Sequence, residues 1–141
     1  MANTYYSIRV DSAANCVADL KAALLDYYGA YADPANPTGV AVLYDTSPYL
    51  IFTCTAIADK PIRIYLATGQ LLGVYYGSGY TTGNNVDDPV SFAGSYLAYG
   101  TATEMHLVLG PHTMLLQQLA STVISKLVLV GQLSNDDYAV L

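Results

Sequence analysis

The sequence predicts an α+β fold: a mainly antiparallel sheet with one long N-terminal helix and a second short helix. Three observations lead to this class. Apolar residues recur at steps of three and four between Ala13 and Tyr28, which is the period of an amphipathic helix. Most of the remaining chain consists of short β-prone segments. Turn signals such as Asp45-Thr46-Ser47-Pro48 separate these segments and favour hairpins.

The first helix is the most strongly patterned element. Tyr5 to Val10 alternates and precedes it as a predicted strand. Asp11 or Ser12 is suited to cap the N-terminus of the helix, because a short polar side chain accepts a hydrogen bond from a free backbone N–H. Gly29 stands where a C-cap glycine is common.

The rest of the chain is predicted to be mainly strands. His112 to Ala120 is the exception: it follows Gly110-Pro111 and is expected to form the second, short helix, with Met114, Leu115 and Leu119 on its buried side. No composition shift or internal repeat marks a boundary, so residues 1–141 are expected to form one α+β domain. The segments expected as strands are Val40 to Tyr44, Tyr49 to Thr55, Ile62 to Leu66, Leu71 to Tyr76, Glu104 to Leu109, Val123 to Val130 and Tyr138 to Leu141. Tyr96 to Tyr99 is expected to be either a short strand or an extended segment.

The composition predicts a surface with few charges. Charged residues make up 11% of the chain, whereas ordinary soluble domains have about 25%. The chain has 14 tyrosines and no tryptophan. Interface centres are depleted in charge and enriched in tyrosine, so this composition favours a surface that packs against other protein. The alternative is that the tyrosines simply fill strands, where aromatic residues fit well.

The charge distribution argues against nucleic acid and membrane partners. The net charge is −6, and the five basic residues are scattered singly, so they form no stripe that could neutralise phosphates or meet an anionic membrane. No apolar run approaches the ~20 residues that span a bilayer. Met1 to Arg9 lacks the pattern of a secretory signal, so synthesis in a cytoplasm is expected.

The candidates for chemistry are sparse. Glu104, His106 and His112 could build a metal site or an acid–base pair, although a Glu-x-His strand face is also typical of the solvated side of a sheet. Asp87 and Asp88 lack the spaced acidic pattern of a calcium loop. We therefore predict no enzyme, no catalytic residue, no bound metal and no cofactor.

The two cysteines are predicted to be buried and unpaired. Cys16 falls on the apolar face of the first helix, and Cys54 falls in a predicted strand. A buried free cysteine behaves as a small hydrophobic residue. A disulfide and a reactive thiol remain as alternatives, and the spacing fits no zinc motif.

The long glycine-rich stretch from Gly77 to Gly94 is the best candidate contact region. A loop of this length in a compact domain is usually functional or disordered. Tyrosines in and around it offer rigid aromatic anchors for a partner. This leaves a second hypothesis, a carbohydrate- or host-protein-binding module that uses this loop. The candidate interface residues are Tyr75, Tyr76, Tyr80, Phe92, Tyr96 and Tyr99.

Several general features of the chain resemble one group of viral proteins. These are the strand–helix opening from Tyr5 to Tyr28, the sparse Lys and Arg, the Ala/Thr/Gly/Tyr-rich strands, the Gly83-Asn84-Asn85 loop and the closing run from Leu127 to Leu141. Together they resemble the small structural head, neck or tail proteins of tailed bacteriophage virions. The resemblance implies a non-enzymatic virion subunit, made in the host cytoplasm, whose partners are copies of itself and other virion proteins.

Overall fold

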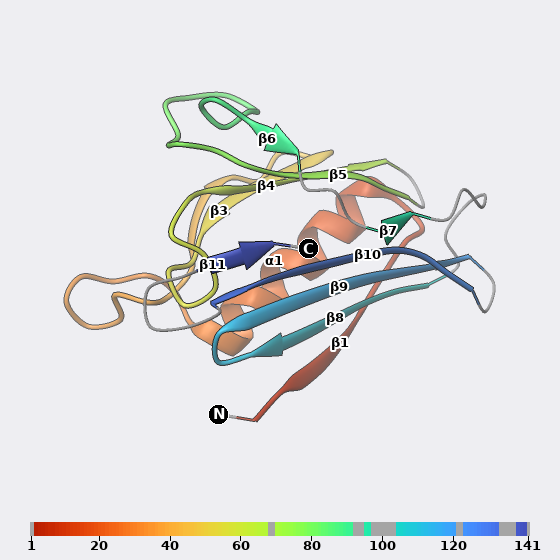
Figure 1. Cartoon of the computed structure of the whole chain (residues 1–141), viewed down its shortest axis with the longest axis horizontal. Coiled ribbons are helices and arrows are strands. Elements are labelled where there is room, and N and C mark those ends of the chain that lie inside the picture. The colour runs from red at the N-terminus through yellow and green to blue at the C-terminus, as the bar shows by residue number, and fades with distance from the viewer. Residues whose placement is uncertain are drawn as a thin grey trace.

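Two antiparallel sheets and one helix make up the described part of the chain, which in this computed structural model covers residues 2–67, 70–91, 95–96, 104–120, 123–132 and 138–140 (Figure 1). Most strands pair with their neighbours in sequence, as hairpins do. The elements are β1 (Thr4–Ile8), α1 (Ala13–Tyr28), β2 (Ala41–Tyr44), β3 (Tyr49–Thr53), β4 (Ile62–Ala67), β5 (Gln70–Tyr76), β6 (Val90–Ser91), β7 (Ser95–Tyr96), β8 (Glu104–Gly110), β9 (Thr113–Ala120), β10 (Val123–Gln132) and β11 (Tyr138–Val140).

The helix contacts both sheets. The six-stranded sheet has the order β1-β8-β9-β10-β11, with β7 also beside β10, and the five-stranded sheet has the order β2-β3-β4-β5-β6. Helix α1 contacts β1 and β8 in the first sheet and β3 and β4 in the second. Figure 1 shows it crossing behind the six-stranded sheet, with the five-stranded sheet above.

Strand alternation decides which side chains enter the core. In β3, Leu50 and Phe52 face inward and have no exposed surface. In β8 of the other sheet, Met105, Leu107 and Leu109 also face the core and are fully or almost fully buried. Because successive side chains point to opposite faces, the residues between them lie on the outer faces of the two sheets.

Both ends of α1 are capped by the residues that the sequence indicates. Ser12 is the N-cap, and its Oγ accepts a hydrogen bond of 3.1 Å from the Asn15 backbone N–H. Gly29 is the C-cap: its φ is 74°, a conformation that favours glycine, and its N–H donates to the Leu25 carbonyl at 2.9 Å.

The predicted fold class, α+β with one long N-terminal helix and a second short helix, is wrong. The structure is mostly antiparallel β-sheet, and the single helix of the described residues, α1, is a short element of 16 residues. This helix packs against both sheets and contributes side chains such as Leu20 and Leu24 to their shared core. No helix in the described residues is long and apolar enough to cross a membrane.

The predicted second helix, His112 to Ala120, is the strand β9. Its residues are good helix formers, but they lie between β8 and β10 and pair with both. Met114 and Leu116 face the core, whereas Leu115 and Leu119 lie on the outer face. Because both faces of this strand are largely apolar, its sequence does not show the alternation that usually marks a strand.

The two cysteines are free and buried, as predicted. Cys16 contacts the sulfur of Met105 at 3.6 Å, and Cys54 Sγ donates to the Thr38 carbonyl at 3.5 Å. Burial raises the pKa of Cys16 to about 12 and that of Cys54 to about 11. Both thiols are therefore protonated packing groups near neutral pH.

Candidate protein-contact surface

The outer face of the five-stranded sheet carries a row of side chains from all five strands. The strand registers place these residues directly opposite one another, so the row crosses the sheet from edge to edge. In order from β2 to β6, the row consists of Tyr44, Ile51, Arg63, Tyr75 and Ser91, of which Ile51 has no exposed surface. Two residues along the strands, on the same face, Tyr49 of β3 lies opposite Tyr65 of β4.

Arg63 lies at the centre of three tyrosine rings. Its guanidinium carbon is 4.7 Å from the ring centroid of Tyr49, 5.1 Å from that of Tyr75 and 5.4 Å from that of Tyr65. The rings of Tyr49 and Tyr65 are stacked, with centroids 5.0 Å apart and planes 19° apart. These cation–π contacts hold the guanidinium in place, each worth about 0.5–1 kcal/mol near a surface. We call these four half-buried residues the Arg63 platform.

A glycine in β5 makes room for one ring of the Arg63 platform. Gly73 lies opposite Tyr65 and two residues before Tyr75. A Cβ at this position would stand 2.7 Å from the Tyr75 ring and 2.9 Å from its hydroxyl oxygen. The ring of Tyr75 therefore lies directly over Gly73, and a glycine inside a strand is the sequence sign of such a close approach.

Arg63 also holds the glycine-rich loop. Its Nε donates a hydrogen bond of 2.7 Å to the carbonyl of Asn84. No carboxylate of the described residues pairs with Arg63. By contrast, Arg9 pairs with Asp19 at 2.9 Å and Lys21 with Asp45 at 2.6 Å. Arg63 is thus a cation whose described contacts are three aromatic rings and one backbone carbonyl.

The described part of the Gly77 to Gly94 loop, residues 77–91, is tied together by its own hydrogen bonds. The backbone N–H of Ser78 donates to the Asp87 carbonyl, and the N–H of Asp87 donates to the Gly79 carbonyl, both at 2.9 Å. The hydroxyls of Thr81 and Ser78 donate to the carboxylates of Asp87 and Asp88 at 2.9 and 2.8 Å. The two carboxylates are therefore used within the loop, and the described residues contain no group of three or more potential metal ligands.

Gly77→Ala is expected to release this loop from the sheet. The new Cβ would stand 2.4 Å from the Cβ of Val86 and 2.7 Å from the carbonyl oxygen of Asp87, so buried Val86 has to move. We expect faster amide hydrogen exchange in residues 78–88, with little change in the melting temperature.

Gly79→Ala is the matched control for this substitution. The nearest atom to its Cβ would be Asp87 Oδ2 at 3.5 Å, an ordinary contact. Equal exchange rates in the two variants would show that Val86 does not anchor the loop.

The three predicted interface residues whose side chains the structure describes, Tyr75, Tyr76 and Tyr80, have different surroundings. Tyr75 belongs to the Arg63 platform, whereas Tyr76 packs against the core, with the Lys60 ammonium 5.7 Å from its ring centroid. Tyr80 donates to the Gly83 carbonyl at 2.8 Å within the loop. Phe92, Tyr99 and the side chain of Tyr96 lie outside the described residues. Sequence reasoning missed Tyr49, Arg63 and Tyr65. Arg63 and Tyr65 share a local signal, since their spacing of two places them on one face of β4, whereas only the strand register brings Tyr49 beside them.

The Glu104, His106 and His112 cluster is only partly assembled. Glu104 Oε2 lies 2.9 Å from His106 Nε2, and the Tyr5 hydroxyl bonds the other ring nitrogen of His106. His112 lies beyond the far end of β8, about 20 Å along the strand from Glu104, and its Nδ1 lies 3.4 Å from the Ala56 carbonyl. The three side chains therefore form no common site.

The outer face of the six-stranded sheet carries a group of apolar side chains next to polar ones such as His106 and Gln117. One register row runs from Tyr5 in β1 through Val108 and Leu115 to Leu129 in β10. Leu127 lies on the same face of β10, two residues before Leu129. Tyr5 is 54% exposed, and the four aliphatic side chains are half-buried. We call these five residues the Leu115 face.

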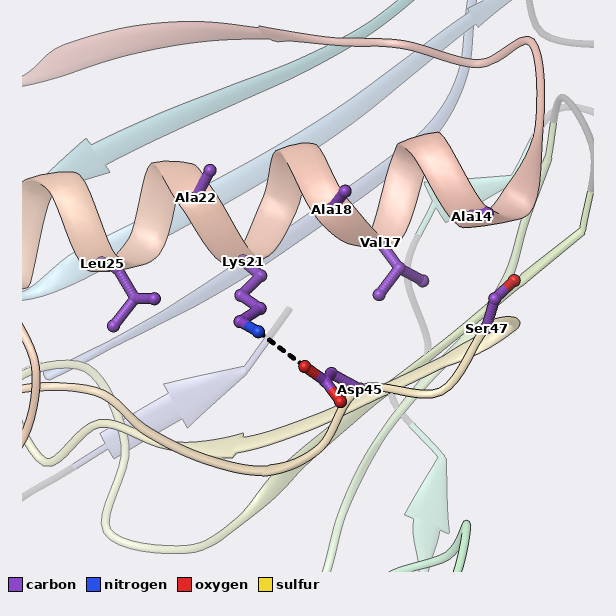
Figure 2. A pocket seen from close by; sticks show the side chains of 8 residues that line it. All are labelled: Ala14, Val17, Ala18, Lys21, Ala22, Leu25, Asp45 and Ser47. Atoms are coloured by element: carbon purple, nitrogen blue, oxygen red, sulfur yellow. Dashed lines mark hydrogen bonds and ion pairs between the residues drawn. The ribbon is translucent and has the colours of Figure 1, made fainter.

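A groove of about 540 Å³ lies between α1 and the turn that joins β2 to β3 (Figure 2). Small side chains such as Ala18 and Ala22 leave it open on the helix side. Figure 2 shows the ion pair of Lys21 and Asp45 crossing it. The two charged residues of the groove are therefore paired with each other. We interpret the groove as part of the packing boundary between the helix and the sheet.

In the part of the chain that the structure describes, we take the Leu115 face and the Arg63 platform as the candidate contact surfaces. One is aliphatic with a tyrosine at its edge, and the other is aromatic with a cation at its centre. Comparisons with protein-family models, curated proteins and solved structures found no match.

Proposed function

We propose that the protein is a non-enzymatic structural or accessory subunit of a tailed phage virion, which self-associates or docks on a partner assembly. The observation that carries this proposal is the Leu115 face. Its side chains come from four adjacent strands and remain partly exposed, although the same strands bury a full set of apolar residues on their inner side. Covering such a face stabilises a complex by about 25 cal/mol for each Å² of apolar surface removed from water.

The distribution of tyrosine supports the same proposal. Tyr28 is the one tyrosine buried in the core among those whose side chains the structure describes. The others lie at least partly at the surface, where they offer rigid contact area with a polar tip. The assignment to a virion rests on the resemblance of the sequence to small phage structural proteins, and genes for capsid or tail proteins beside its own would support it.

Leu115→Lys is expected to abolish self-association or docking. The substitution places a charge at the centre of the Leu115 face, where a partner would have to desolvate it. The fold should persist because Leu115 is only half-buried. Size-exclusion chromatography with light scattering measures self-association, and mass spectrometry of purified virions measures incorporation.

Val90→Lys is the matched control for this experiment. Val90 is an apolar residue of the other sheet and is 46% exposed. The Val90→Lys variant should therefore self-associate and enter virions like the unmodified chain. A chain that stays monomeric at every concentration and is absent from virions would contradict the proposed function.

The alternative function, a carbohydrate- or host-protein-binding module built on the Gly77 to Gly94 loop, has less support. In the described part of the loop, the hydroxyls of Ser78, Tyr80 and Thr81 donate to acceptors within the loop itself. A ligand would have to displace these bonds. Capture of a glycan by the intact protein, lost in the Gly77→Ala variant, would favour this alternative.

A further inference from the structure

The Arg63 platform holds a cation in a fixed position and, among the described residues, leaves most of its N–H donors without an acceptor. A guanidinium has five N–H groups, and the structure shows one hydrogen bond, from Nε to the Asn84 carbonyl. In the described part of the chain, neither terminal nitrogen of Arg63 has an acceptor. The hydroxyls of Tyr49, Tyr65 and Tyr75 likewise have no hydrogen-bond partner among the described residues. The platform therefore offers a planar cation surrounded by three phenols.

The chemistry of this site suits a carboxylate. A guanidinium binds a carboxylate through two parallel N–H···O bonds, and the nearby phenols can donate to the same group. Arg and Tyr are also the residue types that contribute most binding energy at protein interfaces. A sugar is a poorer fit, because the rings of Tyr49 and Tyr65 already stack on each other and pack against the guanidinium.

The chain itself supplies carboxylates in excess. It has 11 acidic residues against five basic ones. Several acidic side chains are already bonded, for example Asp19 to Arg9, Asp26 to Tyr6 and Asp45 to Lys21. Asp33 and Asp59 are exposed and have no such bond among the described residues.

Asp33 lies in a loop that is built to project. Figure 1 shows the segment between α1 and β2, in orange, extending beyond the sheets. Asn36 stiffens it, since its side-chain amide donates to the carbonyls of Tyr28 at 3.1 Å and Ala30 at 2.9 Å. Beside Asp33, Tyr31 is 49% exposed. The loop thus presents a carboxylate and an aromatic ring on a rigid support.

We propose that the Arg63 platform of one copy binds the Asp33 carboxylate of a second copy. This inference rests on the proposed function, because it gives the self-associating subunit a directional contact. The donor loop and the receiving platform are different surfaces, so the contact either occurs twice across a two-fold dimer axis or repeats head to tail from copy to copy. Head-to-tail contacts build rings when the rotation closes and filaments when it does not.

Two substitutions test the contact directly. We expect Arg63→Gln and Asp33→Asn each to weaken self-association by about tenfold or more, because each removes one partner of a desolvated charge pair. The matched controls are Arg9→Gln, which removes the same charge from a residue paired within its own chain, and Asp59→Asn, which removes another exposed carboxylate. Both controls should associate normally. Sedimentation velocity over a range of concentrations measures association, and circular dichroism checks the fold.

Two further variants separate the contact from loop docking. Arg63→Gln also removes the hydrogen bond to the Asn84 carbonyl, so Gly77→Ala, which loosens the same loop and keeps Arg63, should associate normally. The exchange variant with both Arg63→Asp and Asp33→Arg restores opposite charges between copies. This double variant should associate more tightly than the chain with Arg63→Asp alone or the chain with Asp33→Arg alone.

The outcomes separate this inference from the proposed function. If the unmodified chain self-associates and Arg63→Gln or Asp33→Asn leaves that unchanged, the Asp33 contact is wrong, while the proposed function stands. A chain that is monomeric but present in virions would likewise contradict the contact and leave the proposed function intact. Binding of an acidic glycan that Arg63→Gln abolishes, with no effect on oligomeric state, would overturn the contact in favour of carbohydrate recognition.

Discussion

Phe52→Ala is expected to destabilise the folded chain by about 3–5 kcal/mol. Phe52 has no exposed surface and is the largest of the fully buried side chains in the described residues. In register it lies between Val42 of β2 and Ile62 of β4, and it belongs to the core cluster shared by both sheets and the helix. Removing the ring loses its transfer free energy and leaves a cavity that the surrounding strands fill only in part.

Urea denaturation measures this loss. Circular dichroism reports the sheets, and tyrosine fluorescence reports the side chains, since the chain has no tryptophan. Phe52→Leu keeps most of the volume and should cost only about 1 kcal/mol. If Phe52→Ala costs no more than Phe52→Leu, the five-stranded sheet does not depend on this core residue.

The core strands and helix caps were predictable from local patterns. Apolar spacing located α1, Gly29 marked its C-terminal end, and the N-cap was narrowed to Asp11 or Ser12, of which the structure shows Ser12. The Asp45 to Pro48 turn identified the β2–β3 hairpin, which the register confirms. These signals are local because a helix face, a cap and a tight turn each depend on residues close together in the sequence.

The fold class failed where tertiary context outweighed propensity. Residues 113–120 contain Met, Leu, Gln and Ala, which favour a helix, and both faces of the segment are largely apolar. Hydrogen bonding to β8 on one side and β10 on the other makes it an inner strand. The pairing of β1 with β8 is another long-range feature, because it joins segments about one hundred residues apart and no local pattern announces it.

The candidate contact surfaces were only partly predictable for the same reason. Tyr75 was identified from its position before the glycine-rich loop. Its partners Tyr49, Arg63 and Tyr65 come from other strands, and only the register places the four together. A one-residue shift of β4 would move Arg63 to the opposite face of the sheet. Alternation within a strand can be read from sequence, whereas register between strands requires the structure.

Tyr28→Phe is expected to destabilise the chain by about 1–3 kcal/mol, although it removes a single oxygen atom. The Tyr28 hydroxyl donates to the carbonyl of Gly110 at 2.7 Å and approaches that of Thr113 at 3.1 Å. These carbonyls flank the β8–β9 turn, so one side chain links the end of α1 to the six-stranded sheet. Burial raises the pKa of the hydroxyl, which keeps it protonated as the donor. Phenylalanine would leave the buried Gly110 carbonyl without this donor.

Tyr27→Phe is the matched control for this link. Tyr27 is the neighbouring residue, and its hydroxyl also donates to a carbonyl, that of Ala2 at 2.9 Å, but at an exposed position where water can replace it. Its removal should therefore cost about 0.5 kcal/mol or less. Urea denaturation compares the two variants, and hydrogen exchange locates the effect. Exchange in the Tyr28 variant should increase first at the C-terminal end of α1 and at the β8–β9 turn, because these two segments lose their common hydrogen bond. Equal stability of the two variants would mean that packing alone, without the hydroxyl, holds the helix against the sheet.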